Sequence, residues 1–228
     1  MKKTIAILAL AAVAASSSFA QGLVFFSNQN STKISTNAAV GGAAQGVLAQ
    51  TAGQYYFALF YSTTQTTVGG STGAFAGTNS TYVFNASGWS DAGLLGTNSG
   101  TVGGRFASSI NTDAANNATV NGLAGVTAAS FVIIGWSANL GTLAQVESFM
   151  NGNNPLAQAA GWFGESSVSG LITTGNGGTQ VTPATVGVSS PQIGAFYLGE
   201  VIPTPEPGTL ALAALGGASL LMFRRKNK

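Results

Sequence analysis

Two segments of the chain carry apolar side chains at nearly every position, 54–62 (QYYFALFYS) and 129–137 (ASFVIIGWS). Aromatic and β-branched residues dominate both, which is typical of β-strands. Successive side chains of a strand point to opposite faces, and both faces of the first segment are apolar. One face carries Tyr55, Phe57, Leu59 and Tyr61, and the other carries Tyr56, Ala58 and Phe60. We therefore predict two central strands that are covered on both faces.

Shorter apolar runs between glycine-rich turns predict further strands. These are 22–27, 81–85, the residues around Arg105-Phe106, 169–174, 179–186 and 192–202. The Asn-Gly pair within 175–178 suits a hairpin turn between 169–174 and 179–186. The stretches 28–54 and 91–104 are predicted as turns, and 111–121 as a loop or a short helix.

The pattern changes to a helical period after the second central strand. Thr142 and Gln145 have the spacing of a capping box, and the apolar positions that follow are Leu143, Val146, Phe149 and Met150. Asn154-Pro155 then predicts a second short helix through Ala160. The predicted fold is mainly β: a single antiparallel sandwich or jelly-roll-like domain over 21–202, with a short helical insertion near residues 142–161.

The first 20 residues read as a secretory signal peptide rather than as part of the domain. Lys2 and Lys3 precede an apolar stretch, and the small residues Ser18 and Ala20 stand at the positions that a signal peptidase reads. We expect a signal helix over 1–20 that is cleaved between Ala20 and Gln21. A buried N-terminal helix is the alternative.

The last 26 residues also differ from the domain. A proline-rich linker, 203–208, contains Pro205, Glu206 and Pro207, and it precedes an uncharged apolar segment, 209–223. As a helix this segment would be about 22 Å long, against a hydrocarbon core of about 30 Å. The basic residues Arg224, Arg225 and Lys226 begin the tail 224–228 and would stop the segment with its end in the cytoplasm.

The Pro-Glu-Pro element, the short apolar segment with Gly216-Gly217 and the terminal basic cluster together resemble the PEP-CTERM sorting signal of bacterial exported proteins. The resemblance implies passage through the Sec export machinery and recognition by exosortase at Pro205, Glu206 and Pro207. It also implies that the 209–223 helix holds the precursor in the cytoplasmic membrane until the tail is removed, which leaves the protein at the envelope surface or in the extracellular matrix. A permanent anchor and a buried core helix are the alternatives for 209–223.

Charge is scarce and unevenly placed. Charged residues make up 6% of the chain, so Ser, Thr, Asn and Gln must solvate its surface. Six of the eight basic residues lie at the two ends, and the body carries Lys33 and Arg105 against five acidic residues, a net charge of 2 − 5 = −3. Nucleic-acid binding depends on clustered basic residues and is disfavoured.

The chain has neither Cys nor His, which excludes thiol chemistry, imidazole bases and the commonest transition-metal ligands. We expect no cofactor, no metal and no catalysis. The remaining enzymatic alternative is a carboxylate pair drawn from Asp91, Asp113, Glu147, Glu165 and Glu200. The Asn-rich segment 111–117 is read as a turn, with a calcium loop as the alternative.

Three tryptophans could serve as core residues or as platforms for sugar rings. Trp136 lies in a central strand and is predicted to be core. Packing is also favoured for Trp89 and Trp162, and stacking on a ligand is the alternative for these two. The leading hypothesis is a non-catalytic structural protein of the cell surface or matrix. A carbohydrate-binding module for exopolysaccharide is the rival hypothesis, followed by a carboxylate-dependent glycoside-active enzyme.

Overall fold

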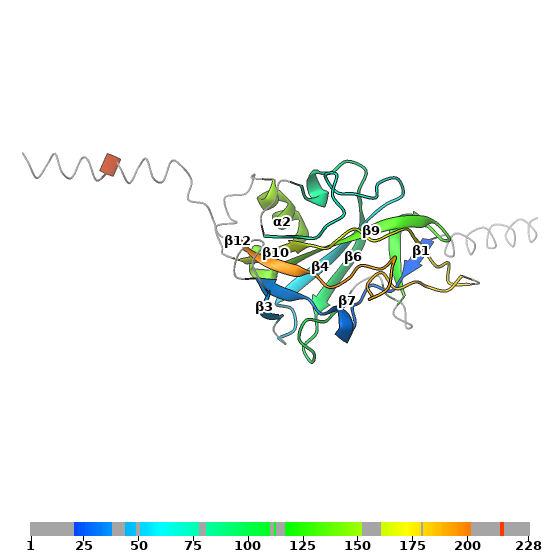
Figure 1. Ribbon diagram of the computed structural model, residues 1–228, viewed down its shortest axis with the longest axis horizontal. Helices are drawn as coiled ribbons and strands as arrows, with labels where there is room; N and C mark the ends of the chain where they lie inside the picture. Colours follow the sequence, from blue (N-terminus) through cyan, green and yellow to red (C-terminus); the bar gives the residue numbers. More distant parts are fainter. Residues whose placement is uncertain are drawn as a thin grey trace, which may run out of the picture.

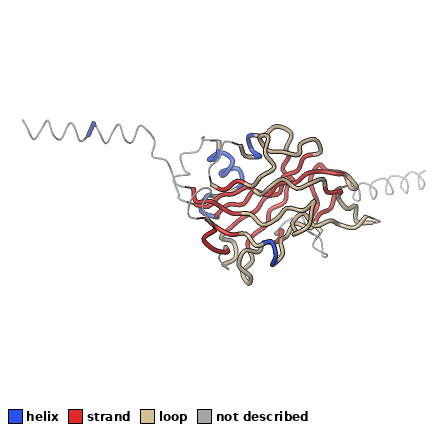
Figure 2. The backbone as a smooth tube through the Cα atoms, in the orientation of Figure 1, coloured by secondary structure: helices blue, strands red, loops and turns tan. Residues whose placement is uncertain are grey.

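A computed structural model of the chain describes residues 21–37, 44–48, 51–77, 81–109, 112, 117–151, 161–178, 180–201 and 215–216. Figures 1 and 2 show a body built mainly of strands, with short helices at its periphery. The predicted mainly β class is confirmed. The predicted signal helix, the 154–160 helix and nearly all of the 203–228 tail lie outside the described residues.

Strands β4 (Tyr55–Ser62) and β9 (Ala128–Ser137) form the centre of the sheet, as predicted. They pair antiparallel over the whole of β4, from Tyr55 opposite Ser137 to Ser62 opposite Ser130. Both faces are covered, and the two sets of side chains predicted for 54–62 separate into two hydrophobic clusters. We call these the inner core, which contains Phe57, Leu59, Phe131 and Ile133, and the outer core, which contains Ala58, Phe60, Val132, Ile134 and Trp136.

Among the residues that the structure describes, the main sheet has ten strands, eight of them in the order β3-β2-β12-β10-β9-β4-β6-β7. The bounds of the other six are β2 Ser35–Asn37, β3 Ala44–Val47, β6 Ser90–Asn98, β7 Phe106–Ser108, β10 Gly161–Glu165 and β12 Tyr197–Val201. Two short strands lie off this path, β5 (Phe75–Ala76) on β10 and β11 (Ile172–Thr173) on β9. A separate two-stranded sheet pairs β1 (Gln21–Val24) with β8 (Ala118–Ala124). The predicted antiparallel order is wrong at one pair, because β12 runs parallel to β2.

The main sheet curls until its two ends meet around the inner core. At the junction, Ile34 donates its N–H to the carbonyl of Gly104, and Gly104 donates to the carbonyl of Leu48. The chain that follows β1 also pairs with β7, since Ser108 donates to the carbonyl of Phe26. The curl therefore encloses the inner core, and the outer core lies on the other face of the sheet.

Asn28 holds this closure together. Its side chain is fully buried. Its Nδ2 donates to the carbonyl oxygens of Thr32 (2.7 Å) and Gly104 (2.8 Å), and its Oδ1 accepts from the N–H of Phe106 (2.7 Å). One amide thus joins the two ends of the curled sheet through three backbone groups.

Asn28→Ala is expected to lower the free energy of unfolding by about 2 kcal/mol, because it leaves buried backbone groups without partners. Urea unfolding followed by tryptophan fluorescence measures the change. The control is Asn30→Ala, which alters an exposed residue of the helical turn η1 (Asn30–Thr32) and should change stability by less than about 0.5 kcal/mol. Equal effects of the two substitutions would contradict the role given to Asn28.

A layer of irregular chain and one helix covers the outer core (Figure 1). The helix α2 (Leu143–Met150) begins at the predicted capping box, in which Thr142 and Gln145 bond each other's backbone. Val146 is buried, and Leu143, Phe149 and Met150 pack against the outer core, as the helical spacing predicts. The helical turn η2 (Val83–Asn85) lies in the same layer, and a third turn, η3 (Ala138–Leu140), links β9 to α2.

Several local predictions are wrong. The predicted strand 81–85 contains the helical turn η2 instead, the predicted turn 91–104 contains most of β6, and the predicted loop 111–121 contains the start of β8. Residues 28–54, predicted as turns, contain η1, β2 and β3, and Gly161, at the end of the predicted helical insertion, is the first residue of the strand β10. The predicted hairpin is not formed by the described residues, because Ile172–Thr173 pairs with β9 while Ala184 bridges Phe25. In each case pairing with a distant segment overrides the local sequence signal.

Candidate functional site

The described residue with the most unusual environment is Glu165, the last residue of β10. Alternation along the strand places it on the same face as Phe163, a member of the outer core. Its neighbours across the sheet are Ile134 on β9 and Phe75 on β5. A carboxyl group thus stands on the apolar outer face of a sheet strand.

The Glu165 side chain is completely buried, with 0% of its surface exposed. Its Oε2 accepts a hydrogen bond of 2.8 Å from the N–H of Val83, while its Oε1 has no hydrogen-bond partner. Burial raises the pKa of Glu165 from 4.5 to about 7, and the Val83 hydrogen bond offsets part of that rise. The group therefore changes charge near neutral pH.

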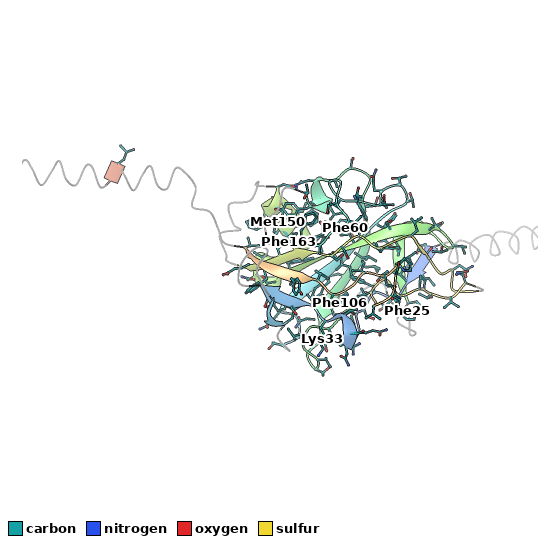
Figure 3. The ribbon with its side chains drawn as sticks, viewed as in Figure 1. Phe25, Lys33, Phe60, Phe106, Met150 and Phe163 are labelled. Atoms are coloured by element: carbon teal, nitrogen blue, oxygen red, sulfur yellow. The ribbon has the colours of Figure 1, made fainter. Side chains whose placement is uncertain are left out.

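The neighbouring elements offer no compensating charge. Strands β5 and β9 and the turn η2 carry no ionisable side chain. The phenol of Tyr82 lies in the same layer, where its ring packs edge-on against that of Phe163 with the centroids 5.5 Å apart. The basic residues of the body, Lys33 and Arg105, lie at the closure of the sheet. Figure 3 shows Lys33 and Phe163 on opposite sides of the sheet.

The other acidic residues do not form a catalytic pair with Glu165 among the described residues. Asp91 lies on β6, separated from β10 by β9 and β4, which is about 14 Å at roughly 4.8 Å per strand. Glu200 is opposite Trp162, so it projects from the other face of the sheet, and Glu147 is exposed on α2. Asp113 lies outside the described residues. Carboxyl groups that cleave glycosides together lie about 5 to 9.5 Å apart.

The calcium alternative for 111–117 also gains no support. Residues 113–116 lie outside the described part of the chain. Within the part that the structure describes, no group of three or more acidic residues is placed to hold a metal ion.

A surface pocket of about 290 Å³ lies in the layer above Glu165. Its walls come from two segments, 65–70 and 81–87, the second of which contains η2. The polar side chains that line it are Gln65, Thr67, Thr81, Tyr82, Asn85 and Ser87. The N–H of Val83, which donates to the Glu165 carboxyl, belongs to the second wall. The buried carboxyl therefore holds this wall in place without lining the pocket.

The two walls approach each other closely at Gly69. A Cβ atom there would come within 2.6 Å of the Thr81 side chain, and the φ of Gly69 is +56°, a conformation that favours glycine. Gly69 thus sets the spacing at the base of the pocket.

The tryptophans act mainly in packing. Trp136 is fully buried in the outer core, as predicted, and its Nε1 donates to the carbonyl of Gly141. Trp89 and Trp162, the candidates for ligand stacking, are half-buried and pack against the outer and inner cores respectively. Trp89 Nε1 donates to the carbonyl of Thr67 at 3.2 Å, so this ring braces a wall of the pocket.

Neither the pocket nor the burial of Glu165 was predicted from the sequence. The available signal was the alternation Phe163-Gly164-Glu165, which assigns the carboxyl and the phenyl ring to one face once these residues form a strand.

The sorting residues Pro205, Glu206, Pro207, Arg224, Arg225 and Lys226 lie outside the described residues, as does Ala20. Gln21, on the other side of the predicted cleavage point, is the first residue of β1. Within the predicted 209–223 helix only Leu215 and Gly216 are described, and both are helical. In the described part of the chain, no helix has the length and apolar character needed to span a membrane.

Comparison with protein families finds the PEP-CTERM protein-sorting motif at residues 203–226. The match covers the tail in which the Pro-Glu-Pro element was recognised, and it leaves the body unassigned. No curated protein and no solved structure matches the chain.

Proposed function

We propose that this chain is an exported structural protein that exosortase sorts through its C-terminal tail, and that it acts without catalysis at the envelope surface or in the extracellular matrix. The PEP-CTERM motif at residues 203–226 is the observation that carries this proposal, because such motifs are generally exosortase substrates. Export by the Sec machinery, removal of 1–20 and transient anchoring by 209–223 belong to the same proposal.

The architecture of the body is compatible with this role. The described body begins at Gln21 and ends at Val201, two residues before the matched motif, so the motif follows the last strand directly. Neutral hydroxyl and amide side chains, rather than ions, dominate the polar residues of the chain. Within the described residues, no second carboxyl lies where it could pair with that of Glu165 in glycoside hydrolysis.

Removal of both ends gives a direct prediction for the protein isolated from its native host. Intact-mass spectrometry should show a dominant species that begins at Gln21 and lacks the basic residues from Arg224 onward. Because recognition is assigned to the Pro-Glu-Pro element, Glu206→Ala should leave the tail in place. The matched control, Glu200→Ala, changes an acidic residue of the body and should be processed normally.

A dominant native species that retains Phe223 to Lys228 would contradict removal of the tail and favour the permanent anchor. Deletion of exosortase in the host is the complementary experiment. It should convert the processed species into the form that retains the tail.

A further inference from the structure

The pocket between 65–70 and 81–87 has the chemistry of a site for a neutral, hydroxyl-rich ligand. Its polar lining side chains are two amides and four hydroxyls, all of them groups that can donate and accept hydrogen bonds. No described lining residue carries a charge. A sugar hydroxyl also donates and accepts, whereas an anionic ligand would require a basic partner of the kind that Lys33 and Arg105 could supply only at the closure of the sheet.

The walls of the pocket are held in place before any ligand arrives. Trp89 Nε1 holds the Thr67 carbonyl in the first wall, and Ser62 Oγ accepts from the N–H of Gln65 at 2.9 Å. In the second wall, Glu165 holds the Val83 N–H, and the rings of Tyr82 and Phe84 contact Phe163 at 5.5 and 6.4 Å. Walls that are already fixed lose little conformational entropy when a ligand binds, and this favours binding.

The size of the pocket limits the ligand. A volume of about 290 Å³ is at the lower end of the range for small-molecule sites, roughly 300 to 1,000 Å³. It therefore accommodates one or two sugar units rather than a long segment of polymer, and its open surface position leaves the rest of a chain outside.

We propose that this pocket binds a neutral sugar unit of an extracellular polysaccharide. The source of the ligand rests on the proposed function, since a matrix polysaccharide is available only to an exported protein. Asn85 and Ser87 line the pocket and are exposed, so substitutions at these residues test the site with little risk to the fold. Glu165 is a positioning residue here, because it holds Val83 and does not line the pocket.

The test is calorimetric titration of the full chain in a zwitterionic detergent that lacks a sugar headgroup. The neutral probes are cellotetraose and maltotetraose, and the anionic probe is tetragalacturonate. We expect saturable binding of a neutral probe at one site per chain and no binding of the anionic probe. Ser87→Trp should block the pocket and weaken binding by at least about tenfold, and Asn85→Ala by about fivefold through loss of hydrogen bonds.

Ser189→Trp places the same ring at an exposed position outside the pocket and should bind as the unchanged chain does. Three results would each overturn the proposal: no binding of either neutral probe, preferential binding of tetragalacturonate, or equal affinities for Ser87→Trp and Ser189→Trp. The intact-mass measurement in the native host reports sorting separately. Failure of the sugar site is therefore distinguishable from failure of the proposed export and processing.

Discussion

Ionisation of Glu165 is expected to lower the free energy of unfolding by about 3 kcal/mol as the pH rises from about 4.5 to about 7. The folded body holds the Glu165 proton more tightly than the unfolded chain does, because burial raises the pKa of this carboxyl to about 7. Its contribution to stability is therefore complete below pH 4.5 and is lost through this interval. Above the folded pKa the contribution is constant, because both states are then ionised.

Glu165→Gln isolates this effect. The amide oxygen of Gln can still accept from the Val83 N–H, and the side chain no longer titrates. Urea unfolding at a series of pH values should show that the variant lacks the 3 kcal/mol decline, whereas Glu200→Gln, at a half-buried position on β12, retains it. If the free energy of unfolding changes with pH by the same amount in the unchanged protein and in Glu165→Gln, folding does not raise the pKa of the Glu165 carboxyl and the prediction is wrong.

Phe163→Ala is expected to destabilise the protein by about 4 kcal/mol, within the range for truncating a fully buried aromatic ring. Phe163 is 0% exposed, and its ring joins the sheet to the covering layer through Tyr82 and Phe84. Truncation removes these ring contacts and opens a cavity beneath the second wall of the pocket. Phe163→Leu should cost less, about 1 to 1.5 kcal/mol, because it keeps most of the volume.

Thermal and urea unfolding measure both substitutions against Leu171→Ala, where a side chain that is 58% exposed should contribute less than about 0.5 kcal/mol. Hydrogen exchange adds a local measurement, since Phe163→Ala should increase exchange at Val83 more than at the N–H groups of β4. A uniform increase across both regions would argue that Phe163 contributes to the whole sheet rather than joining the covering layer to it.

The central strands and the helix could be predicted because their signals are local. In β4 and β9 every position from Phe57 to Tyr61 and from Phe131 to Trp136 is occupied by a residue that suits a two-sided strand, apart from Gly135. The capping box and the apolar stripe of α2 lie within nine consecutive residues. Such patterns need no knowledge of distant segments.

The strands that were missed depend on distant partners. In β6 the buried positions Ala92, Leu94, Gly96 and Asn98 alternate correctly, but small and polar residues conceal the pattern. Phe106 packs so closely that a Cβ at Gly96 would come within 2.9 Å of its ring, so glycine there reflects packing rather than a turn. Residues 81–85 have strand-like composition, yet the hydrogen bond from Val83 to Glu165, 82 residues later, accompanies a helical turn instead.

The tail could be predicted from a local signal, whereas the pocket depends on segments that are distant in the sequence. The Pro-Glu-Pro element is a contiguous signal, and the family comparison confirms its identification at residues 203–226. The pocket is assembled from two segments that β5 separates, and its support comes from a third segment, β10. Nothing in the composition of either wall indicates that Gly69 meets Thr81.

The position of β12 determines how the body would carry a mechanical load. This strand ends at Val201, where the chain leaves for the tail, and it lies inside the sheet between β2 and β10 (Figure 1). It is hydrogen-bonded on one side from Tyr197 to Gly199 and on the other from Gly199 to Val201. Tension applied through the tail acts along β12, so the bonds on both sides are loaded together in shear rather than opened one after another. In a precursor anchored as proposed, the load would therefore enter the sheet through an interior strand rather than through an edge strand.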